Sequence, residues 1–164
     1  MERKIVEDYQ HMVYGIALNR VGSKFDADDV FQEVFLIYFQ KRKDFQDEEH
    51  RRAWLIKTTL NCCKRAVSNT WKKKTVLFED IPLTSISKSP ELTYQFESRE
   101  ENSVFTTLRG LPEKYRMVLH LFYFESFTTD EIASAMGITP PAVRMRLKRG
   151  RDMMREKLKG EYDL

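Results

Sequence analysis

Apolar residues recur every three or four positions along most of this chain, which is the spacing of amphipathic helices. From Ile5 to Trp71 no alternating stretch bounded by turn residues indicates a strand. Changes in the pattern predict three helices, which together form one compact helical unit. Their expected limits are Val6 to Val21, with Gly22 as the stop, then Asp26 to Phe39, and then Asp47 to Asn69.

After Lys72 the pattern gives way to a stretch rich in Ser, Thr and Pro, which is typical of a linker. Helical spacing resumes at Glu100 and continues to Lys159, with breaks that predict four short helices. The breaks lie at Gly110-Leu-Pro, Ser126-Phe-Thr-Thr and Gly137-Ile-Thr-Pro-Pro. The sequence therefore predicts an all-α fold, with a helical domain over residues 1–72, a flexible linker over 73–98 and a second helical domain over 99–164.

The second predicted domain contains the signature of a helix-turn-helix. Thr128, with Glu131 three residues later, forms a capping box that opens a helix, and Gly137 permits the tight turn that ends it. Thr139 can then cap a second helix that begins with Pro140 and Pro141. Proline loses nothing at these positions, because amides of the first helical turn have no partner within the helix.

The second of these helices has one apolar and one basic face. At about 100° per residue, Val143, Leu147, Gly150 and Met154 fall on a single stripe that should face the core. No acidic residue occurs between Thr139 and Arg151. Arginine can pair with guanine, and any cation can contact phosphate. The predicted DNA-binding residues are Pro141, Ala142, Arg144, Met145, Arg146, Lys148, Arg149 and Arg151.

A solvated basic helix is the alternative interpretation of this charge run. The cap, the glycine turn and the correctly phased apolar stripe coincide with the charges, and this combination favours DNA binding. The net charge of +3 is small, so the interpretation rests on where the cations lie.

Composition narrows the remaining function classes. The adjacent Cys62 and Cys63 exclude a disulfide framework, and the three histidines show no zinc-site spacing, so we expect neither metal nor cofactor. With no apolar run long enough for a membrane span or a signal peptide, we expect no membrane insertion and a cytoplasmic protein.

Several motifs together resemble the sigma-70 family of RNA polymerase sigma factors, especially its extracytoplasmic-function (ECF) group. In the second half these are Leu-Pro-Glu-Lys-Tyr-Arg from Leu111, then Thr-Asp-Glu-Ile-Ala, Met-Gly-Ile-Thr and Val-Arg-Met-Arg-Leu. In the first half they are Asp26-Ala-Asp-Asp-Val-Phe-Gln-Glu-Val-Phe-Leu and Arg52-Ala-Trp-Leu-Ile-Lys-Thr-Thr-Leu-Asn. The resemblance depends on this combination and covers nearly the whole chain. Pro140-Pro141, and Gly150 where alanine is common, depart from the family pattern.

The resemblance implies a role for each half of the chain. The residues expected to bind core RNA polymerase are Asp29, Gln32 and Glu33, and those expected to hold the melted non-template strand of the minus-ten element are Asn61, Lys64 and Arg65. The second domain would bind the minus-thirty-five duplex. Trp54 is expected in the core, and the two cysteines are expected to fill space beside the minus-ten site. Such factors commonly have an anti-sigma partner.

The sequence thus predicts a sigma factor that recruits core polymerase to specific promoters and supports promoter opening. The main alternative is a stand-alone helix-turn-helix repressor or activator, whose first half would carry a ligand pocket or a dimer seam in place of these motifs. An enzyme is less favoured, because Cys, His and carboxylates do not assemble into a catalytic spacing.

Overall fold

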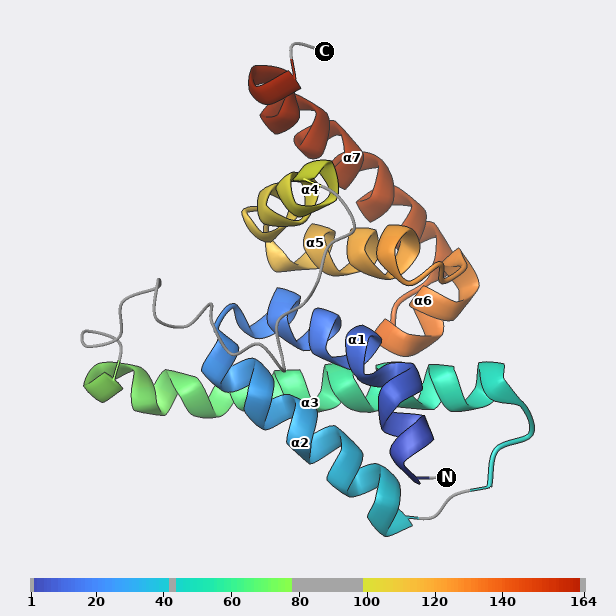
Figure 1. Ribbon diagram of the computed structural model, residues 1–164. Coiled ribbons are helices and arrows are strands. Elements are labelled where there is room, and N and C mark those ends of the chain that lie inside the picture. Colours follow the sequence, from blue (N-terminus) through green and yellow to red (C-terminus); the bar gives the residue numbers. More distant parts are fainter. Residues whose placement is uncertain (1, 42–43, 78–98, 163–164) are drawn as a thin grey trace. The chain divides into compact units, whose positions relative to one another are not determined.

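The computed structural model describes residues 2–41, 44–77 and 99–162 and divides the chain into two compact units, residues 1–94 and 95–164. Every regular element within those ranges is a helix, as the sequence predicts (Figure 1). Each unit has its own core, and the two are considered separately below. Residues 78–98, most of the predicted linker, lie outside the described ranges.

Unit 1 is a three-helix unit in which each helix packs on the other two. It comprises α1 (Glu2–Val21), α2 (Lys24–Lys41) and α3 (Glu48–Leu77). The buried side chains at the centre of the unit come from all three helices and include Val13, Ile16, Val30, Val34, Leu55 and Ile56. The predicted α1 and α2 are confirmed, while α3 runs beyond Asn69 to Leu77, into the segment whose composition suggested a linker.

Short polar side chains determine where the helices of unit 1 begin. Gly22 adopts a φ of 79° after α1, a left-handed conformation that suits glycine. Ser23 then caps α2, since its Oγ accepts from the amide of Asp26 at 3.2 Å and donates to the Asp26 carboxylate at 2.9 Å. Asp47 caps α3 by accepting from the amide of His50 at 2.8 Å. The cap at Ser23 explains why α2 starts two residues before Asp26, the predicted start.

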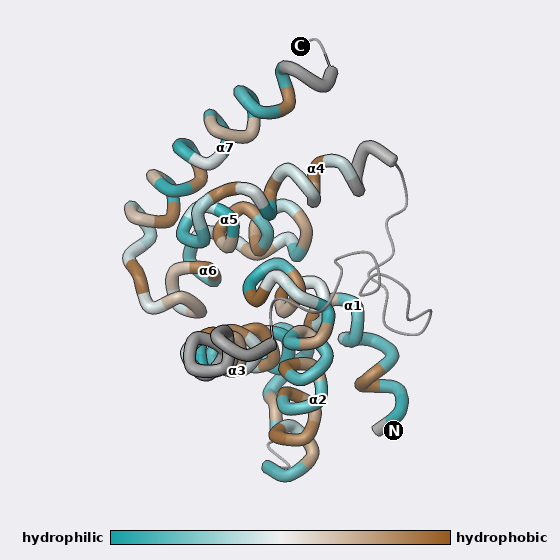
Figure 2. Tube along the Cα trace, turned by 90° about the vertical axis from the view of Figure 1, so that its left-hand side faces the viewer, coloured by the Kyte–Doolittle hydropathy of each residue, from teal (hydrophilic) through white to brown (hydrophobic). Residues whose placement is uncertain are grey.

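Unit 2 contains the four predicted helices and one further turn. The helices are α4 (Arg99–Arg109), α5 (Glu113–Leu119), α6 (Thr129–Met136) and α7 (Pro140–Tyr162), and α7 packs against the other three. A π-helical turn, η1 (His120–Phe124), continues α5. The periodicity did not predict this turn, in which the fully buried His120 ring stacks on Phe124 at 5.2 Å. Along α7, hydrophilic and hydrophobic residues alternate with the helical repeat (Figure 2).

Candidate nucleic-acid interface

The helix-turn-helix of unit 2 begins with the predicted capping box. The Thr128 hydroxyl accepts from the amide of Glu131, and the Glu131 carboxylate accepts from the amide of Thr128, both at 3.1 Å. Gly137 ends α6 with a φ of 69°, and the amide of Ile138 donates to the Ala133 carbonyl at 3.0 Å. The predicted turn is therefore confirmed, and its hydrogen bonds define where α7 starts.

The first turn of α7 has its backbone donors either absent or already bonded. Pro140 and Pro141 carry no amide proton. The Ala142 amide donates to the Thr139 hydroxyl at 3.3 Å, and the Val143 amide donates to the Thr139 carbonyl at 3.1 Å. Helix N-termini commonly bind phosphate through such amides. Any contact of this helix end with DNA, as predicted from the sequence, would therefore come from side chains.

The predicted phase of α7 is confirmed for its first three turns. Val143, Leu147 and Gly150 are buried, whereas Met154 is only half-buried. The predicted DNA-binding side chains lie outside this stripe. Of these, Pro141, Arg144, Met145, Lys148, Arg149 and Arg151 are exposed, and Ala142 and Arg146 are half-buried. Within the described residues, none of the five cations among them forms an ion pair with a carboxylate.

Helix α5 contributes two features to this surface that the sequence did not reveal. The proximity of Arg149 lowers the pKa of the Tyr115 phenol. Lys114, whose ammonium lies 5.0 Å from the centre of the Tyr115 ring, is exposed and adds another cation. The family motif includes Lys114 and Tyr115, but only the packing of α5 on α7 places them beside Arg149.

Gly150, one of the residues that depart from the family pattern, lies where α7 crosses α5. A Cβ atom at this position would be 2.7 Å from Leu119 Cδ1, 3.1 Å from Leu119 Cγ and 3.5 Å from Tyr115 Cβ. Glycine therefore permits the close approach of the two helices. Glycine within a helix also lowers helix stability by about 1 kcal/mol relative to alanine.

In unit 1 the three residues predicted to bind the minus-ten strand lie on one exposed side of α3. Asn61, Lys64 and Arg65 are exposed, while Cys62 and Cys63 between them are buried. Arg65 is engaged within the protein, since its guanidinium lies 2.7 Å from Glu33 of α2 and 3.2 Å from Cys62 Sγ. These two contacts raise the pKa of Arg65. The structure thus joins a predicted DNA-binding residue to a predicted polymerase-binding residue.

The two cysteines are free thiols with no exposed surface. Burial raises the pKa of both, that of Cys63 to about 12. A thiol held in its neutral form is a poor nucleophile. The structure therefore agrees with a space-filling role for both side chains.

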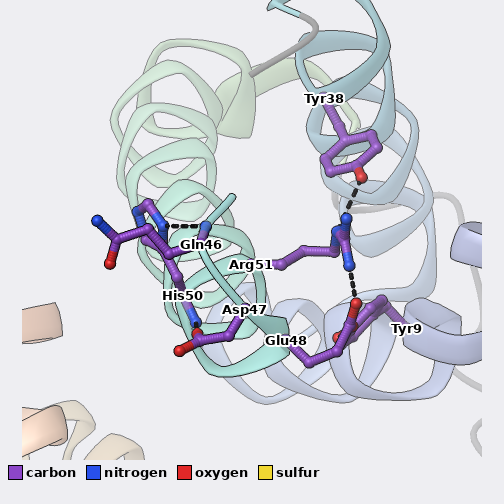
Figure 3. Close-up of polar contacts among 7 residues, drawn as sticks. All are labelled: Tyr9, Tyr38, Gln46, Asp47, Glu48, His50 and Arg51. Carbon is purple, nitrogen blue, oxygen red and sulfur yellow. Dashed lines mark hydrogen bonds and ion pairs between the residues drawn. The ribbon is translucent and has the colours of Figure 1, made fainter. Parts of the chain in front are cut away.

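The start of α3 is tied to α1 and α2 through Arg51. Its Nε donates to the Tyr38 hydroxyl at 3.1 Å and its guanidinium pairs with Glu48, which also accepts from the Tyr9 hydroxyl (Figure 3). Trp54 contacts the Tyr38 ring at 5.9 Å and the Phe45 ring at 5.8 Å. Trp54 was expected in the core, and the structure places it, half-buried, in an aromatic cluster at the edge of the core.

The predicted polymerase-binding side of α2 extends farther than its polar residues. Asp29 and Gln32 are exposed, and Glu33 is half-buried beside Arg65. Phe25 and Leu36, at 65% and 58% exposure, lie on the same stripe as Asp29 and Gln32 and opposite the buried side of the helix. Neither was among the residues predicted from the sequence, although their phase relative to Val30 and Val34 marks both as exposed.

Comparisons with known proteins agree with this geometry. The model of sigma-70 region 2 matches residues 5–73, and the model of sigma-70 region 4 matches residues 102–154. The chain belongs to the sigma-70 family, in its ECF group. A stand-alone regulator would not have the region 2 match in its first half, so that alternative loses its basis.

This sigma factor is 28% identical over 163 residues to the ECF RNA polymerase sigma-E factor of Haemophilus influenzae, with 94% of this chain and 85% of the relative covered. It is 27% identical over 157 residues to the RNA polymerase sigma-H factor of Pseudomonas aeruginosa, covering 90% and 81%. The fold is shared with the sigma factor RpoE of Bartonella quintana, solved in complex with the anti-sigma factor NepR. That match has a TM-score of 0.72 and 17% identity and covers 96% of each chain.

In the part of this sigma factor that the structure describes, no three His, Cys, Asp or Glu side chains gather closely enough to hold a metal ion. Nor does any described helix have the length and apolar character needed to cross a membrane.

Proposed function

We propose that the two units of this sigma factor divide promoter recognition between them. Unit 1 docks on core RNA polymerase through α2 and holds the opened minus-ten strand through α3, while unit 2 reads the minus-thirty-five duplex through α7. The observation that carries the proposal is the exposed face of α7. Its cations have no carboxylate partners among the described residues and stand opposite a buried stripe, in a chain whose first half matches region 2.

The α7 face suits duplex DNA. An α-helix fits the major groove, where arginine can form paired hydrogen bonds with guanine. Arg144, Lys148 and Arg149 project from the side opposite the buried stripe or from its shoulders, and Lys114 adds charge from α5. Because these cations form no ion pair with a carboxylate among the described residues, they are available to bases and phosphates.

The α2 face suits a protein partner. Phe25 and Leu36 form the apolar ends of the stripe, and Asp29 and Gln32 lie between them. Neither apolar side chain packs in the core of unit 1, so both are available to a partner. We propose that this stripe, together with Glu33, contacts core polymerase.

The α3 face suits single-stranded DNA. Asn61 can bond a base edge and Lys64 can contact phosphate, and both are exposed. The ion pair with Glu33 competes with a strand phosphate for Arg65. Docking of α2 on polymerase would engage Glu33, and we propose that this releases Arg65 for the strand.

The two units belong to one chain, so binding by one unit raises the effective concentration of the other at the promoter. Two sites of modest affinity can therefore together give specific promoter binding. The role requires binding surfaces and no catalytic centre, and it places the chain with polymerase in the cytoplasm. We also propose control by an anti-sigma partner, which the complex of the related RpoE with NepR supports.

The proposal is tested by in vitro transcription with purified core polymerase. Leu36→Ala should weaken core binding and leave duplex affinity unchanged, whereas Arg144→Ala should weaken duplex binding and leave core binding unchanged. Arg3→Ala in α1 and Arg155→Ala in α7 are matched controls that alter other exposed cations. A protein that bound duplex DNA but not core polymerase would contradict the proposal.

A further inference from the structure

Met145 is an exposed apolar side chain on a basic face. It is 54% exposed, near the centre of the side opposite Val143 and Leu147, and therefore contributes little to the core of unit 2. Single exposed apolar residues are common on proteins. This one, however, is surrounded on α7 by Arg144, Lys148 and Arg149, on the surface that the proposed function places in the major groove.

The turn before Met145 is apolar as well. Pro141, four residues earlier, is exposed on the same side of the helix. Neither proline has an amide proton, and the amides of Ala142 and Val143 are bonded to Thr139. The leading end of α7 therefore presents apolar side chains on this side and offers no backbone donor to a phosphate.

The exposed side of α7 opposite the buried stripe changes from apolar to charged along the helix. It begins with Pro141 and Met145, continues with Lys148 and Arg149, and meets an acid at Asp152, which pairs with Arg155 at 3.8 Å. The basic half can hydrogen-bond to guanine or phosphate. The apolar half needs an apolar partner, and the group of that kind on base edges in the major groove is the C5-methyl of thymine.

We propose that Met145, supported by Pro141, selects thymine in the minus-thirty-five element by packing on its C5-methyl group. The inference rests on the proposed function, because it requires α7 to enter the major groove. Removing one buried methyl group should weaken binding about fourfold, which corresponds to ~0.8 kcal/mol per group.

The experiment first identifies the preferred sequence with holoenzyme made from the full chain and core polymerase. A promoter library randomised across the minus-thirty-five region is selected by wild-type protein, Met145→Ala and Met153→Ala. The last variant makes the same change later on the same helix, at a half-buried methionine. Wild type and Met153→Ala should enrich thymine at a position where Met145→Ala does not.

The second step removes the methyl group alone. In a duplex of the selected sequence, deoxyuridine replaces each thymidine singly, which keeps every hydrogen-bonding group of the base. For wild type, one replacement should weaken holoenzyme binding about fourfold, as estimated for one methyl group. For Met145→Ala the same replacement should have no effect, and for Arg149→Ala it should keep its effect.

The outcomes separate this inference from the proposed function. Transcription by wild-type holoenzyme without thymine enrichment, or with no effect of deoxyuridine, would overturn the role of Met145 alone. Equal deoxyuridine effects in wild type and Met145→Ala would also overturn it, since another group would then contact the methyl. Absence of any promoter-dependent transcription would instead overturn the proposed function, and with it the inference.

Discussion

The two proposed DNA-binding faces differ in how their cations are held. On α7, none of the five cations pairs with a carboxylate in the part of the chain that the structure describes. On α3, Arg65 is bonded to Glu33 and to Cys62 Sγ. Among the described residues, the cations of the proposed duplex-reading surface are thus free of ion pairs, whereas one cation of the proposed strand-holding surface is paired with Glu33.

This difference matches the proposed sequence of events in initiation. The minus-thirty-five duplex exists before the promoter opens, so a preformed surface can bind it at once. The melted strand exists only after polymerase has been engaged, so a cation released by docking would act at the right stage. An exposed ion pair is suited to hold Arg65 until α2 docks, since such a pair contributes at most about 1 kcal/mol to stability and breaks readily.

The largest effect is predicted for removal of cations from the exposed side of α7. Replacing Arg144, Lys148 and Arg149 together by alanine should weaken duplex binding by about 100-fold or more, because each substitution removes a contact with a base or a phosphate. Each lost phosphate contact should also reduce the slope of log affinity against log salt concentration by about one. Fluorescence anisotropy of a labelled duplex across a salt series measures both quantities. Arg155→Ala is the control, and similar losses in that variant would show that net charge, not the face, determines binding.

The next prediction concerns pH and the core of unit 1. Burial raises the pKa of the Cys63 thiol to about 12 in the folded protein, whereas the thiol of the unfolded chain ionises near pH 9. Stability from this group is therefore complete below pH 9 and declines as the pH rises, by up to about 1.4 kcal/mol per pH unit. Urea unfolding followed by tryptophan fluorescence should show a shallower decline in Cys63→Ala. Identical slopes would indicate that Cys63 ionises in the folded state.

The third prediction concerns the crossing of α5 and α7. Gly150→Ala gains about 1 kcal/mol in helix propensity but overpacks Leu119, at a cost of about 1–3 kcal/mol, so unit 2 should lose stability by roughly 1 kcal/mol. Both tryptophans, Trp54 and Trp71, lie in unit 1, so tryptophan fluorescence monitors that unit while circular dichroism monitors both.

A second variant shows whether the contact with Leu119 is the cause. In a Leu119→Ala background, which removes the closest atoms, Gly150→Ala should become stabilising. If it raises the stability of unit 2 in the wild-type background as well, the helices can separate without cost and the close approach is not required.

The smallest effect is expected at the Glu33–Arg65 pair. Glu33→Gln should release Arg65 and tighten binding of a single-stranded minus-ten oligonucleotide, in the absence of polymerase, by at most about fivefold. Glu7→Gln is the matched control, because it breaks another exposed pair, with Arg3 on α1. Unchanged or weaker oligonucleotide binding by Glu33→Gln would contradict the proposal that Glu33 keeps Arg65 from the strand.

Local patterns predicted much of this molecule. The capping box at Thr128, the turn at Gly137 and the phase of Val143 and Leu147 depend on neighbouring residues, and the structure confirms all of them. Continuation of α3 to Leu77 was missed, because its last turns have the composition of a linker.

Features that depend on packing between helices could not be predicted in this way. Glu33 and Arg65 are 32 residues apart, and only the contact of α2 with α3 joins them. The need for Gly150 likewise arises where α5 meets α7, and a sequence shows only its unfavourable effect on the helix. The exposed Phe25 and Leu36 were predictable from phase, but as apolar residues they were not considered as part of a polar flank.

The division of labour between the two faces is tested most directly by promoter opening. Holoenzyme is mixed with a closed promoter, or with a promoter whose minus-ten region is already unpaired, each carrying 2-aminopurine in the non-template strand. The Lys148→Ala, Arg149→Ala double variant should lose the fluorescence increase on the closed promoter and retain binding to the unpaired one. Equal loss on both templates would contradict the account, because reading the duplex and holding the strand would then depend on the same surface.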